Sequence, residues 1–448
     1  MRAPKRALCL LAIVMALALA FFVVPAVTDS GQQASADAPF QLIYYDGHMH
    51  TTRSDGSGTV AQIKATALAR DLDAVIITDH CKQLTQAEWA SLKADTAAVS
   101  DSTFLALPAF EITGSEGLLN RGHMNAYNAP DPFVGEDSLE LCPEEVWEDP
   151  PNPAGTGANA ESLEKWASYV HSQGGIANHN HTSGSTQVSY GVNNIEIYNQ
   201  SHVDDVAGYA AQLGYPPNLA WQFGIMLNNL AIYGERDLGI LVPWPLPPPA
   251  QMPVKYAVYY ATQFFTGVGQ WLGAPQAPLN SWDDLLMAYV DGTVKRPTFG
   301  VANSDAHNTG WTTNPLQSDV GVAKNGLYVK ALTADEVYKA IKSGRSFATT
   351  GPSLALTVNG KMMGSAAKIA SGGSATLNLS ATAETAGYAV AKIDIYKNGQ
   401  LWNTIPGGGP TTLTDTVTAD GYYRIEVTSL GPGLPQFAYS NPVFVDVP

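Results

Sequence analysis

The feature that most constrains this chain is a series of short apolar runs that each end in a histidine or a carboxylate. The first run, residues 40–45, has the composition of a β-strand and is followed closely by His48 and His50. Two histidines at positions i and i+2 beyond a strand end point to one face and can reach one metal ion. Asp55 follows in a Ser/Gly-rich turn. Such histidine–carboxylate sets bind Zn, Mn or Fe and activate water near neutral pH.

The same combination recurs, because further short apolar runs alternate with stretches of helical spacing. Thr85 and Glu88 have the spacing of a capping box. Helices are predicted over residues 59–70, 85–99 and 159–173. Further strands are predicted over residues 72–78, 103–112, 122–127, 176–178, 194–198 and 297–302. This alternation indicates parallel βαβ units, and about seven strands favour an irregular closed barrel with its chemistry at the carboxyl-end rim.

Groups that commonly bind metals gather at the predicted strand ends. Six of the nine histidines lie there, together with three carboxylates in matching places. The nine candidate ligands are His48, His50, His80, His123, His179, His307, Asp55, Glu111 and Asp305. A solitary histidine at a strand end is usually a hydrogen-bonded structural group, but so many ligand groups on one rim predict a metal site.

Two segments depart from the strand–helix alternation. Residues 202–279 contain a proline-rich run at 243–249 and an aromatic stretch at 256–271, and they predict an inserted helical subdomain. A lid over the site and attachment to a membrane surface are the alternatives for this insertion. From residue 352 to 448 the apolar period changes to two, with Asn-Gly turns at 359–360 and 398–399, which predicts an antiparallel β-sandwich.

A further helix is predicted to lead into that sandwich. It covers residues 333–342, and Thr333 and Glu336 again have capping-box spacing. We therefore expect three parts in the chain. They are a leader over residues 1–36, a barrel over residues 40–350 and a sandwich over residues 352–448.

The N-terminal segment has the composition of an export signal. A basic start is followed by an uncharged aliphatic run at residues 7–24 and then by Pro25. Cleavage is expected after Ala26 or Ala36, with a retained membrane anchor as the alternative. Either outcome places the body of the protein outside the cytoplasm, in the periplasm, secreted or at the surface, with membrane contact only through such an anchor. Cys81 and Cys142 are candidates for a disulfide there, although Cys81 also adjoins the candidate ligand His80.

The overall charge excludes one class of partner. The formal net charge is −16 at pH 7, so a nucleic-acid polymer bound through a basic surface is not expected. A small molecule is the expected substrate, and the sequence leaves the oligomeric state open.

The order of these motifs resembles that of the PHP (polymerase and histidinol phosphatase) family. The resemblance covers about residues 42–350. It is carried by His48-x-His50, Ser54-Asp55-Gly56, Thr78-Asp79-His80, Glu111, Gly122-His123, His179 and Asn303-Ser304-Asp305-Ala306-His307. Residues 343–352 also resemble the barrel exit of the exported CehA/McbA-like branch. The resemblance implies an α/β fold with a distorted (β/α)7 barrel and two or three divalent metal ions, either Zn, Mn or Fe.

The resemblance also implies which residues hold each ion. The first ion would be held by His48, His50, Glu111 and Asp305. Glu111 would bridge to a second ion held by His123 and His179. The third ion would be held by Asp55, His80 and His307. The family often has Ala-His-Pro where this chain has Asn178-His179-Asn180, so His181 competes with His179 for one position.

Other residues near the motifs have candidate roles in catalysis or binding. Arg53, Lys82 and Arg121 are candidates to bind a phosphate group, with a solvated surface cation as the alternative for each. Asp46 and Asp79 are expected to orient the ligands from behind, and Glu196 to do the same, to contact substrate or to be structural. The predicted catalytic residues are Glu111 and Asp305, which are also metal ligands, and His181, a candidate proton donor.

These observations together predict an exported metal-dependent hydrolase. The most favoured reaction is hydrolysis of small phosphate esters by a hydroxide that bridges two metal ions. The resemblance to the CehA/McbA-like branch leaves hydrolysis of a carbamate or amide as a second possibility. A surface module that binds a partner without catalysis is a third.

Overall fold

The computed structural model describes residues 39–113, 123–129, 167–180, 191–200, 282–309 and 319–448. Contacts divide the chain into residues 1–39 and residues 40–448, and only the second unit is considered below. The predicted leader and the predicted insertion at 202–279 lie outside the described residues and stay predictions. Among the described helices, none has both the length and the apolarity needed to cross a bilayer.

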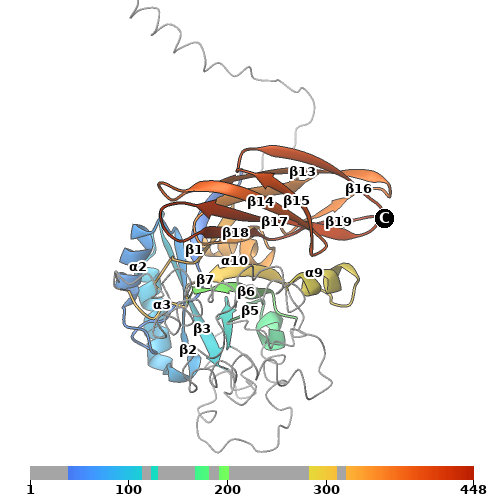
Figure 1. Ribbon diagram of the computed structural model, residues 1–448. Helices are drawn as coiled ribbons and strands as arrows, with labels where there is room; N and C mark the ends of the chain where they lie inside the picture. The colour runs from blue at the N-terminus through green and yellow to red at the C-terminus, as the bar shows by residue number, and fades with distance from the viewer. Residues whose placement is uncertain (1–38, 114–122, 130–166, 181–190, 201–281, 310–318) are drawn as a thin grey trace, which may run out of the picture. The chain divides into compact units, whose positions relative to one another are not determined.

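One large mixed sheet organises the unit and carries the candidate ligands. Its first half has the strand order β8-β1-β2-β3-β4-β5-β6-β7 (Figure 1). These strands are β1 (Gln41–Asp46), β2 (Ala74–His80), β3 (Leu105–Thr113), β4 (His123–Tyr127), β5 (Ile176–His179), β6 (Asn194–Asn199), β7 (Phe299–Asn303) and β8 (Lys324–Val329). Strands β1 to β7 lie within one to three residues of the predicted positions, whereas β8 was not predicted.

The prediction of parallel βαβ units is wrong at β4, and the unpredicted strand β8 is antiparallel as well. Strand β4 runs antiparallel to both β3 and β5, and β8 runs antiparallel to β1. Only residues 114–122 separate β3 from β4, which is too short for the crossover that a parallel pair requires. The remaining pairs, β1–β2, β2–β3, β5–β6 and β6–β7, are parallel as expected.

Asparagine side chains complete the hydrogen bonding along β7. Ala302 donates its N–H to Asn325 Oδ1 at 2.9 Å, and Asn325 Nδ2 donates to the Ala302 carbonyl at 2.6 Å. Asn441 makes the same pair of bonds with Gly300, at 2.8 and 3.2 Å. Buried main-chain N–H and C=O groups need hydrogen-bond partners. These two side-chain amides supply such partners to β7 in place of the backbone of a neighbouring strand. A fully closed barrel stays a prediction.

Two helices pack on the outer face of this sheet. The predicted capping box of Thr85 and Glu88 is confirmed, and a second, unpredicted one is present at Thr59 and Gln62. The helices are α2 (Val60–Ala69), capped by Thr59, and α3 (Gln86–Val99), capped by Thr85. Val75 and Ile77 of β2 share an apolar cluster with these helices, whereas Ala74 and Ile76 belong to a second cluster inside the sheet. Both faces of the strand are therefore buried, which explains its continuous apolar sequence.

Two further helices complete the unit. Helix α9 (Trp282–Val290) was not predicted, and α10 (Ala334–Lys342) covers the inner apolar cluster. Thr333 caps α10 as expected, but the Glu336 carboxylate accepts from the Lys330 N–H instead of from Thr333. Residues 167–172 are helical, within the third predicted helix.

The C-terminal strands form two sheets that share one apolar cluster. Their bounds are β9 (Ser346–Thr349), β10 (Ser353–Val358), β11 (Lys361–Met362), β12 (Ala366–Lys368), β13 (Gly373–Thr382), β14 (Ala389–Lys397), β15 (Gln400–Pro406), β16 (Thr411–Val417), β17 (Gly421–Leu430), β18 (Gln436–Ser440) and β19 (Val443–Asp446). Strand β9 pairs with both β8 and β18, so one sheet runs on from the ligand-bearing strands. The predicted boundary at residue 351 therefore stays a prediction.

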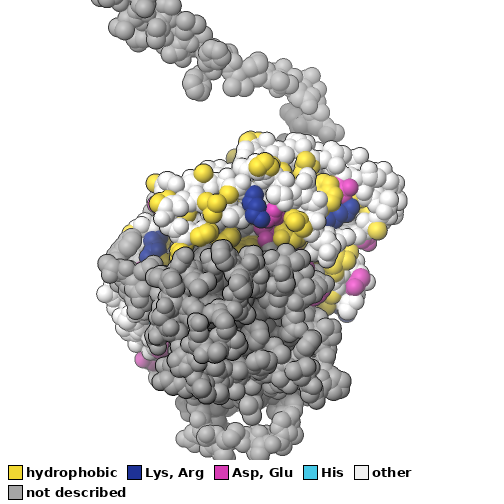
Figure 2. Space-filling view, viewed as in Figure 1, with side chains coloured by type: hydrophobic (Ala, Val, Ile, Leu, Met, Phe, Trp, Pro, Cys, Tyr) yellow, Lys and Arg dark blue, Asp and Glu magenta, His cyan; other side chains and the backbone are white. Residues whose placement is uncertain are grey.

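The outer surface of these strands is mostly polar and weakly charged. Figure 2 shows scattered apolar side chains among neutral polar ones on the described part of this face. Both predicted Asn-Gly turns are present, with positive φ at Asn359 (48°) and Gly360 (74°), and at Asn398 (52°) and Gly399 (75°). These angles suit the tight hairpin turns that the sequence predicts.

Candidate metal centre

The ligand-bearing segments meet at one edge of the sheet. His80 is the last residue of β2, and Glu111 lies near the end of β3. Because β4 is antiparallel to β3, its first residue, His123, comes to the same edge. The loop after β1 is joined to the loop after β7, since the His50 N–H donates to the Ala306 carbonyl at 2.9 Å.

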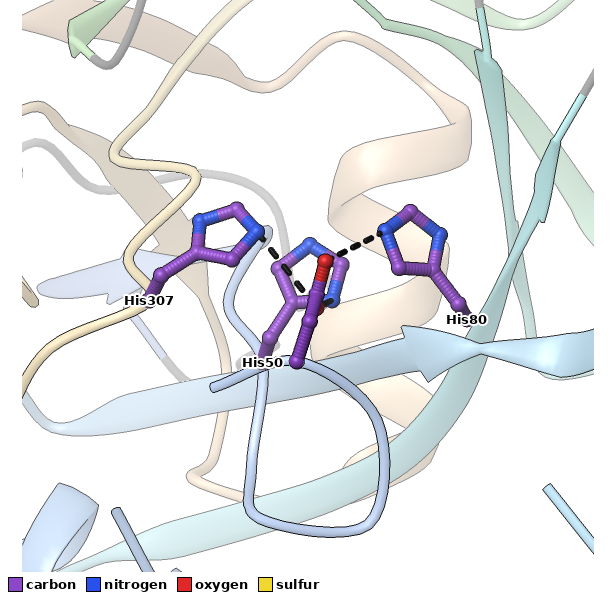
Figure 3. A group of neighbouring side chains, drawn as sticks. His50, His80 and His307 are labelled. Atoms are coloured by element: carbon purple, nitrogen blue, oxygen red, sulfur yellow. Dashed lines mark ion pairs between the residues drawn. The ribbon is translucent and has the colours of Figure 1, made fainter. Parts of the chain in front are cut away.

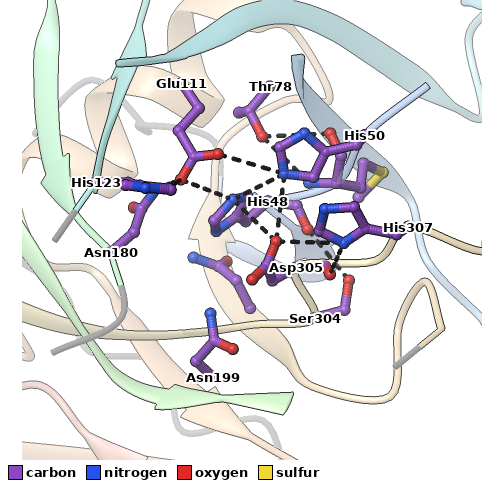
Figure 4. A network of polar contacts seen from close by, with 12 residues as sticks. His48, His50, Thr78, Glu111, His123, Asn180, Asn199, Ser304, Asp305 and His307 are labelled. Carbon is purple, nitrogen blue, oxygen red and sulfur yellow. Dashed lines mark hydrogen bonds and ion pairs between the residues drawn. The ribbon is translucent and has the colours of Figure 1, made fainter. Parts of the chain in front are cut away.

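The deepest group consists of His48, His50, Glu111 and Asp305, all of them buried. Asp305 Oδ1 lies 3.3 Å from His48 Nε2 and 3.2 Å from His50 Nε2, and the two Nε2 atoms are 3.3 Å apart. The Glu111 oxygens lie 3.3 and 3.4 Å from the same two nitrogens. Ligands bound tetrahedrally about 2.0–2.1 Å from an ion lie about 3.3 Å from one another, so this spacing fits a divalent metal. Figure 4 shows both imidazoles turned toward Glu111 and Asp305.

A second group of ligand atoms surrounds Asp55. Its Oδ1 lies 3.5 Å from His50 Nδ1 and 3.5 Å from His307 Nε2, and its Oδ2 lies 3.3 Å from His80 Nε2. The His50 ring lies between the rings of His80 and His307, with centroids 4.6 and 4.3 Å away (Figure 3). These four side chains have the chemistry and spacing to hold a metal ion.

Glu111 connects the two groups to a third. Its Oε1 lies 3.0 Å from His123 Nδ1, and its Oε2 lies 3.1 Å from His80 Nδ1. His80, Glu111 and His123 therefore form another set that could hold an ion. A carboxylate whose two oxygens face different histidines can serve two ions at once, which is the role expected for Glu111.

Glu196 fixes the orientation of His48 from behind. Glu196 Oε1 lies 2.9 Å from His48 Nδ1, so the ring donates there and presents Nε2 to the other ligands. The same carboxylate accepts from Asn303 Nδ2 and Asn199 Nδ2, each at 2.8 Å. Asn303 Oδ1 in turn accepts the Gly47 N–H at 3.0 Å. Of the roles proposed for Glu196, these contacts favour orientation of a ligand.

Asp46 and Asp79 hold the loops that carry the ligands. Asp46 accepts from the main-chain N–H groups of His48, Ser304 and Gly321 at 3.4, 3.1 and 2.9 Å. Asp79 accepts from Thr51 N–H at 2.6 Å and from the Thr51 and Ser54 hydroxyls at 2.7 Å. These contacts orient the ligands through the backbone, which differs from the expected contact with an imidazole.

The mutual electrostatics stabilise the charged forms of His48, Glu111 and His307, whereas burial lowers the pKa of His50. Burial lowers the pKa of His48, but Asp305, Glu111 and Glu196 outweigh burial and raise it well above its usual value. Burial raises the pKa of Glu111, but His48 and His123 outweigh it and lower that pKa well below normal. Partial burial lowers the pKa of His307, but Asp55 and Asp305 outweigh it and raise that pKa to about 9. Metal binding must therefore displace protons from these imidazoles.

The remaining predicted residues are placed as follows. The Arg53 guanidinium is paired with Asp95 and donates to the Ser91 hydroxyl at 3.0 Å, so it contacts α3. His179 is buried, but it shares a face of β5 with Ala177, which belongs to the outer apolar cluster, and it joins none of the three groups. The Lys82 side chain, Arg121 and His181 lie outside the described residues. Their roles and that of His179 stay predictions.

Cys81 is disulfide-bonded, with its partner outside the described residues. The pairing with Cys142 therefore stays a prediction.

Sequence reasoning missed two residues that contact the centre. Asn180 Nδ2 donates to Glu111 Oε1 at 2.8 Å, and Asn303 holds Glu196 as described above. Both residues lie inside the motifs Asn178-His179-Asn180 and Asn303-Ser304-Asp305, so their place in the sequence could have indicated a role at the site. Unlike histidine or a carboxylate, asparagine is not a typical metal ligand, so neither residue stood out in the sequence from an asparagine with a structural role.

The chain is similar to a few solved structures, all at low sequence identity. No model of a known family matches the chain, and no curated protein matches it. A two-domain protein from Bacteroides vulgatus containing a predicted PHP-like metal-dependent phosphoesterase is similar at 13% identity and a TM-score of 0.34, covering 92% of this chain and 100% of that one.

Two further solved structures match smaller parts of the chain. A protein from Bifidobacterium adolescentis, provisionally assigned as a metal-dependent phosphoesterase, has 15% identity and a TM-score of 0.24, covering 48% of this chain and 94% of that one. An amidohydrolase from Chromobacterium violaceum, with bound sulfate and no metal, has 16% identity and a TM-score of 0.24, covering 38% and 84%. At such low TM-scores and identities these likenesses carry no weight in assigning a function. The exported CehA/McbA-like branch stays a prediction.

Proposed function

We propose that the protein is a metal-dependent hydrolase that acts on small phosphate esters. The observation that carries this proposal lies at one sheet edge, where the Nε2 atoms of His48 and His50 are 3.2–3.4 Å from carboxylate oxygens of Glu111 and Asp305 and from each other. Histidine and carboxylate ligands suit Zn, Mn or Fe. When bound, such ions polarise the ester and make a water molecule nucleophilic near neutral pH.

The residues of the chain contribute positions and charges to this reaction. His48 is held by Glu196 with Nε2 facing inward, and Glu111 spans the three ligand groups. Asp55 is about two-fifths exposed, so the outer group is the one that faces solvent and is open to a substrate.

Hydrolysis of a carbamate or amide is the second candidate, and one observation favours it. Arg53 is the one predicted phosphate-binding cation whose side chain is described, and it is committed to Asp95 and Ser91. A neutral carbonyl substrate would need no such cation, whereas a phosphate group would gain from one. We also propose that the protein is exported, on the basis of its leader sequence.

Turnover of matched aryl esters separates these candidates. We expect the Mn²⁺- or Zn²⁺-loaded protein to hydrolyse an aryl phosphate faster than the aryl carbamate with the same leaving group, and a chelator to abolish both activities. Release of the phenol followed by absorbance checks this. A preference for the carbamate would favour the second candidate, and no turnover of either substrate would contradict a hydrolase with this specificity.

A further inference from the structure

A row of buried asparagines lies beside Glu111 inside the sheet. Glu111 is the register partner of Asn125, which pairs with Asn178, which pairs with Asn194, across β3, β4, β5 and β6. Register partners on adjacent strands point to the same face. The three asparagines have 0% exposure. A layer of carboxamides therefore adjoins the carboxylate that joins the ligand groups.

Two amides connect this layer to Glu111 through hydrogen bonds. Asn178 Nδ2 donates to Asn180 Oδ1 at 2.8 Å, and Asn180 Nδ2 donates to Glu111 Oε1 at 2.8 Å. The Asn180 N–H also donates to the His123 carbonyl at 2.8 Å, which fixes its backbone. Figure 4 shows the Asn180 side chain next to Glu111 and His123.

The direction of this chain of bonds follows from the chemistry of Glu111. An ionised carboxylate only accepts hydrogen bonds, so Asn180 must present its NH₂ group to it. The Asn180 oxygen then faces Asn178, which must present its own NH₂ group in turn. The Asn178 oxygen is left facing the interior and requires a donor there.

That donor does not come from the described protein atoms. Within the described ranges, Asn178 Oδ1 and both amide atoms of Asn194 are buried without a hydrogen-bond partner. The Tyr127 hydroxyl donates to the Gly47 carbonyl at 2.8 Å and accepts from the Asn125 amide, so it offers no donor to Asn178. Buried polar atoms in native proteins are paired with protein or with ordered water. Water suits this place, because a buried water makes two to four bonds to donors and acceptors such as these.

We propose that ordered water bound by Asn125, Asn178 and Asn194 holds the Asn178–Asn180 pair so that Asn180 acts as a positioning residue for Glu111. The bond from Asn180 turns Glu111 so that Oε1 faces His48 and His123 while Oε2 faces His50 and His80. This role rests on the proposed metal centre. The proposal thereby assigns a function to Asn180, which stands where the resembled family often has the proline of Ala-His-Pro.

The first test measures metal affinity, which does not depend on knowing the substrate. Asn180→Leu and Asn180→Asp both remove the donor and keep a side chain that branches at Cγ, and we expect each to weaken Mn²⁺ or Zn²⁺ binding by about 10–100-fold. Asn180→Gln, which keeps an amide donor, should recover part of the loss. Asn403→Asp makes the same charge change on the exposed strand β15 and should leave affinity unchanged. Thermal unfolding of the metal-free variants reports whether each one folds.

Two outcomes of this titration would overturn the proposal. Asn180→Leu binding metal within about twofold of the parent would remove the positioning role. Tighter binding by Asn180→Asp would show that position 180 is a ligand site, where a carboxylate is an improvement.

A high-resolution crystal structure tests the water independently of any activity. We expect a water molecule about 2.7–3.2 Å from Asn178 Oδ1 that also contacts Asn125 or Asn194. Direct amide–amide bonds that exclude water from Asn178 would overturn the proposed positioning of Asn180 by water, even in an active hydrolase. Conversely, ordered water together with a loss of metal affinity in Asn180→Leu would support this positioning even if no phosphate ester is turned over. Failure of the positioning role and failure of the proposed function are therefore distinguishable.

Discussion

Asp305→Asn should lower kcat/KM for an aryl phosphate by about 1000-fold or more, because a ligand charge worth about 4 kcal/mol to the transition state is lost. Asp305 Oδ1 contacts Nε2 of both His48 and His50, at 3.3 and 3.2 Å. The substitution keeps the shape of the side chain and removes its charge. Steady-state kinetics in the presence of excess metal measure the effect.

Asparagine is the informative replacement at this position for a reason specific to the backbone. Asp305 has a positive φ of 53°, a conformation that asparagine adopts readily and alanine does not. Asp305→Asn therefore tests the ligand without adding backbone strain. Asp291→Asn is the matched control, because Asp291 is exposed and its side chain bonds to the Thr293 N–H. Activity of Asp305→Asn within about threefold of the control would contradict a ligand role.

Asp283→Asn should lower the free energy of unfolding by about 3–5 kcal/mol. Asp283 in α9 accepts two bonds from Arg424 in β17, from Nε at 2.7 Å and Nη2 at 2.6 Å. Both side chains are almost wholly buried, and the Tyr422 hydroxyl also donates to Asp283 at 2.6 Å. Removing the carboxylate charge leaves the guanidinium, 4.3 Å from the centroid of the Tyr396 ring, with Glu426 as its remaining ion-pair partner among the described residues. Urea unfolding followed by circular dichroism measures the change.

Two comparisons separate this ion pair from a general effect of charge removal. Asp101→Asn breaks the exposed pair with Lys64, at 2.8 Å, and should leave the free energy of unfolding almost unchanged. The double substitution Asp283→Met with Arg424→Met should recover part of the lost stability, because the buried guanidinium is removed and only the contact of Glu426 with Arg424 is lost in addition. If Asp283→Asn cost no more than Asp101→Asn, the buried pair would not be what joins α9 to the C-terminal strands.

The same contacts affect how the role of residues 352–448 can be tested. Removing them would leave Asp283 without Arg424 and the Gly300 main chain without Asn441. A truncated chain would then lose stability before it reported on binding. Point substitutions on the exposed strands are therefore the better probe of whether this part of the chain binds a partner.

The sequence predicted what local pattern determines. The apolar runs of β1 to β7 and the capping residues Thr85 and Thr333 act within a few residues, so composition and spacing were sufficient to find them. His48, His50, Glu111 and Asp305 could be grouped because strand ends of one sheet meet at one edge.

Features that depend on distant partners were not accessible in this way. The antiparallel direction of β4 follows from a short connection, and β8 is recognisable only through its pairing with β1. The bond between Asp283 and Arg424 spans 141 residues. The sequence also marked the position of Asn180 in a motif but not its bond to Glu111, because an amide acquires its role from its neighbours.

The metal content of the purified protein tests the central claim most directly. Elemental analysis of protein prepared without chelator should find about two to three transition-metal ions per chain, since His48, His50 and their partners form overlapping ligand groups. The variant His48→Ala with His50→Ala, prepared in parallel, should have lost most of that metal while Asp291→Asn retains it. Equal metal in the parent and the double variant, or none in either after incubation with Zn²⁺ and Mn²⁺, would contradict the account.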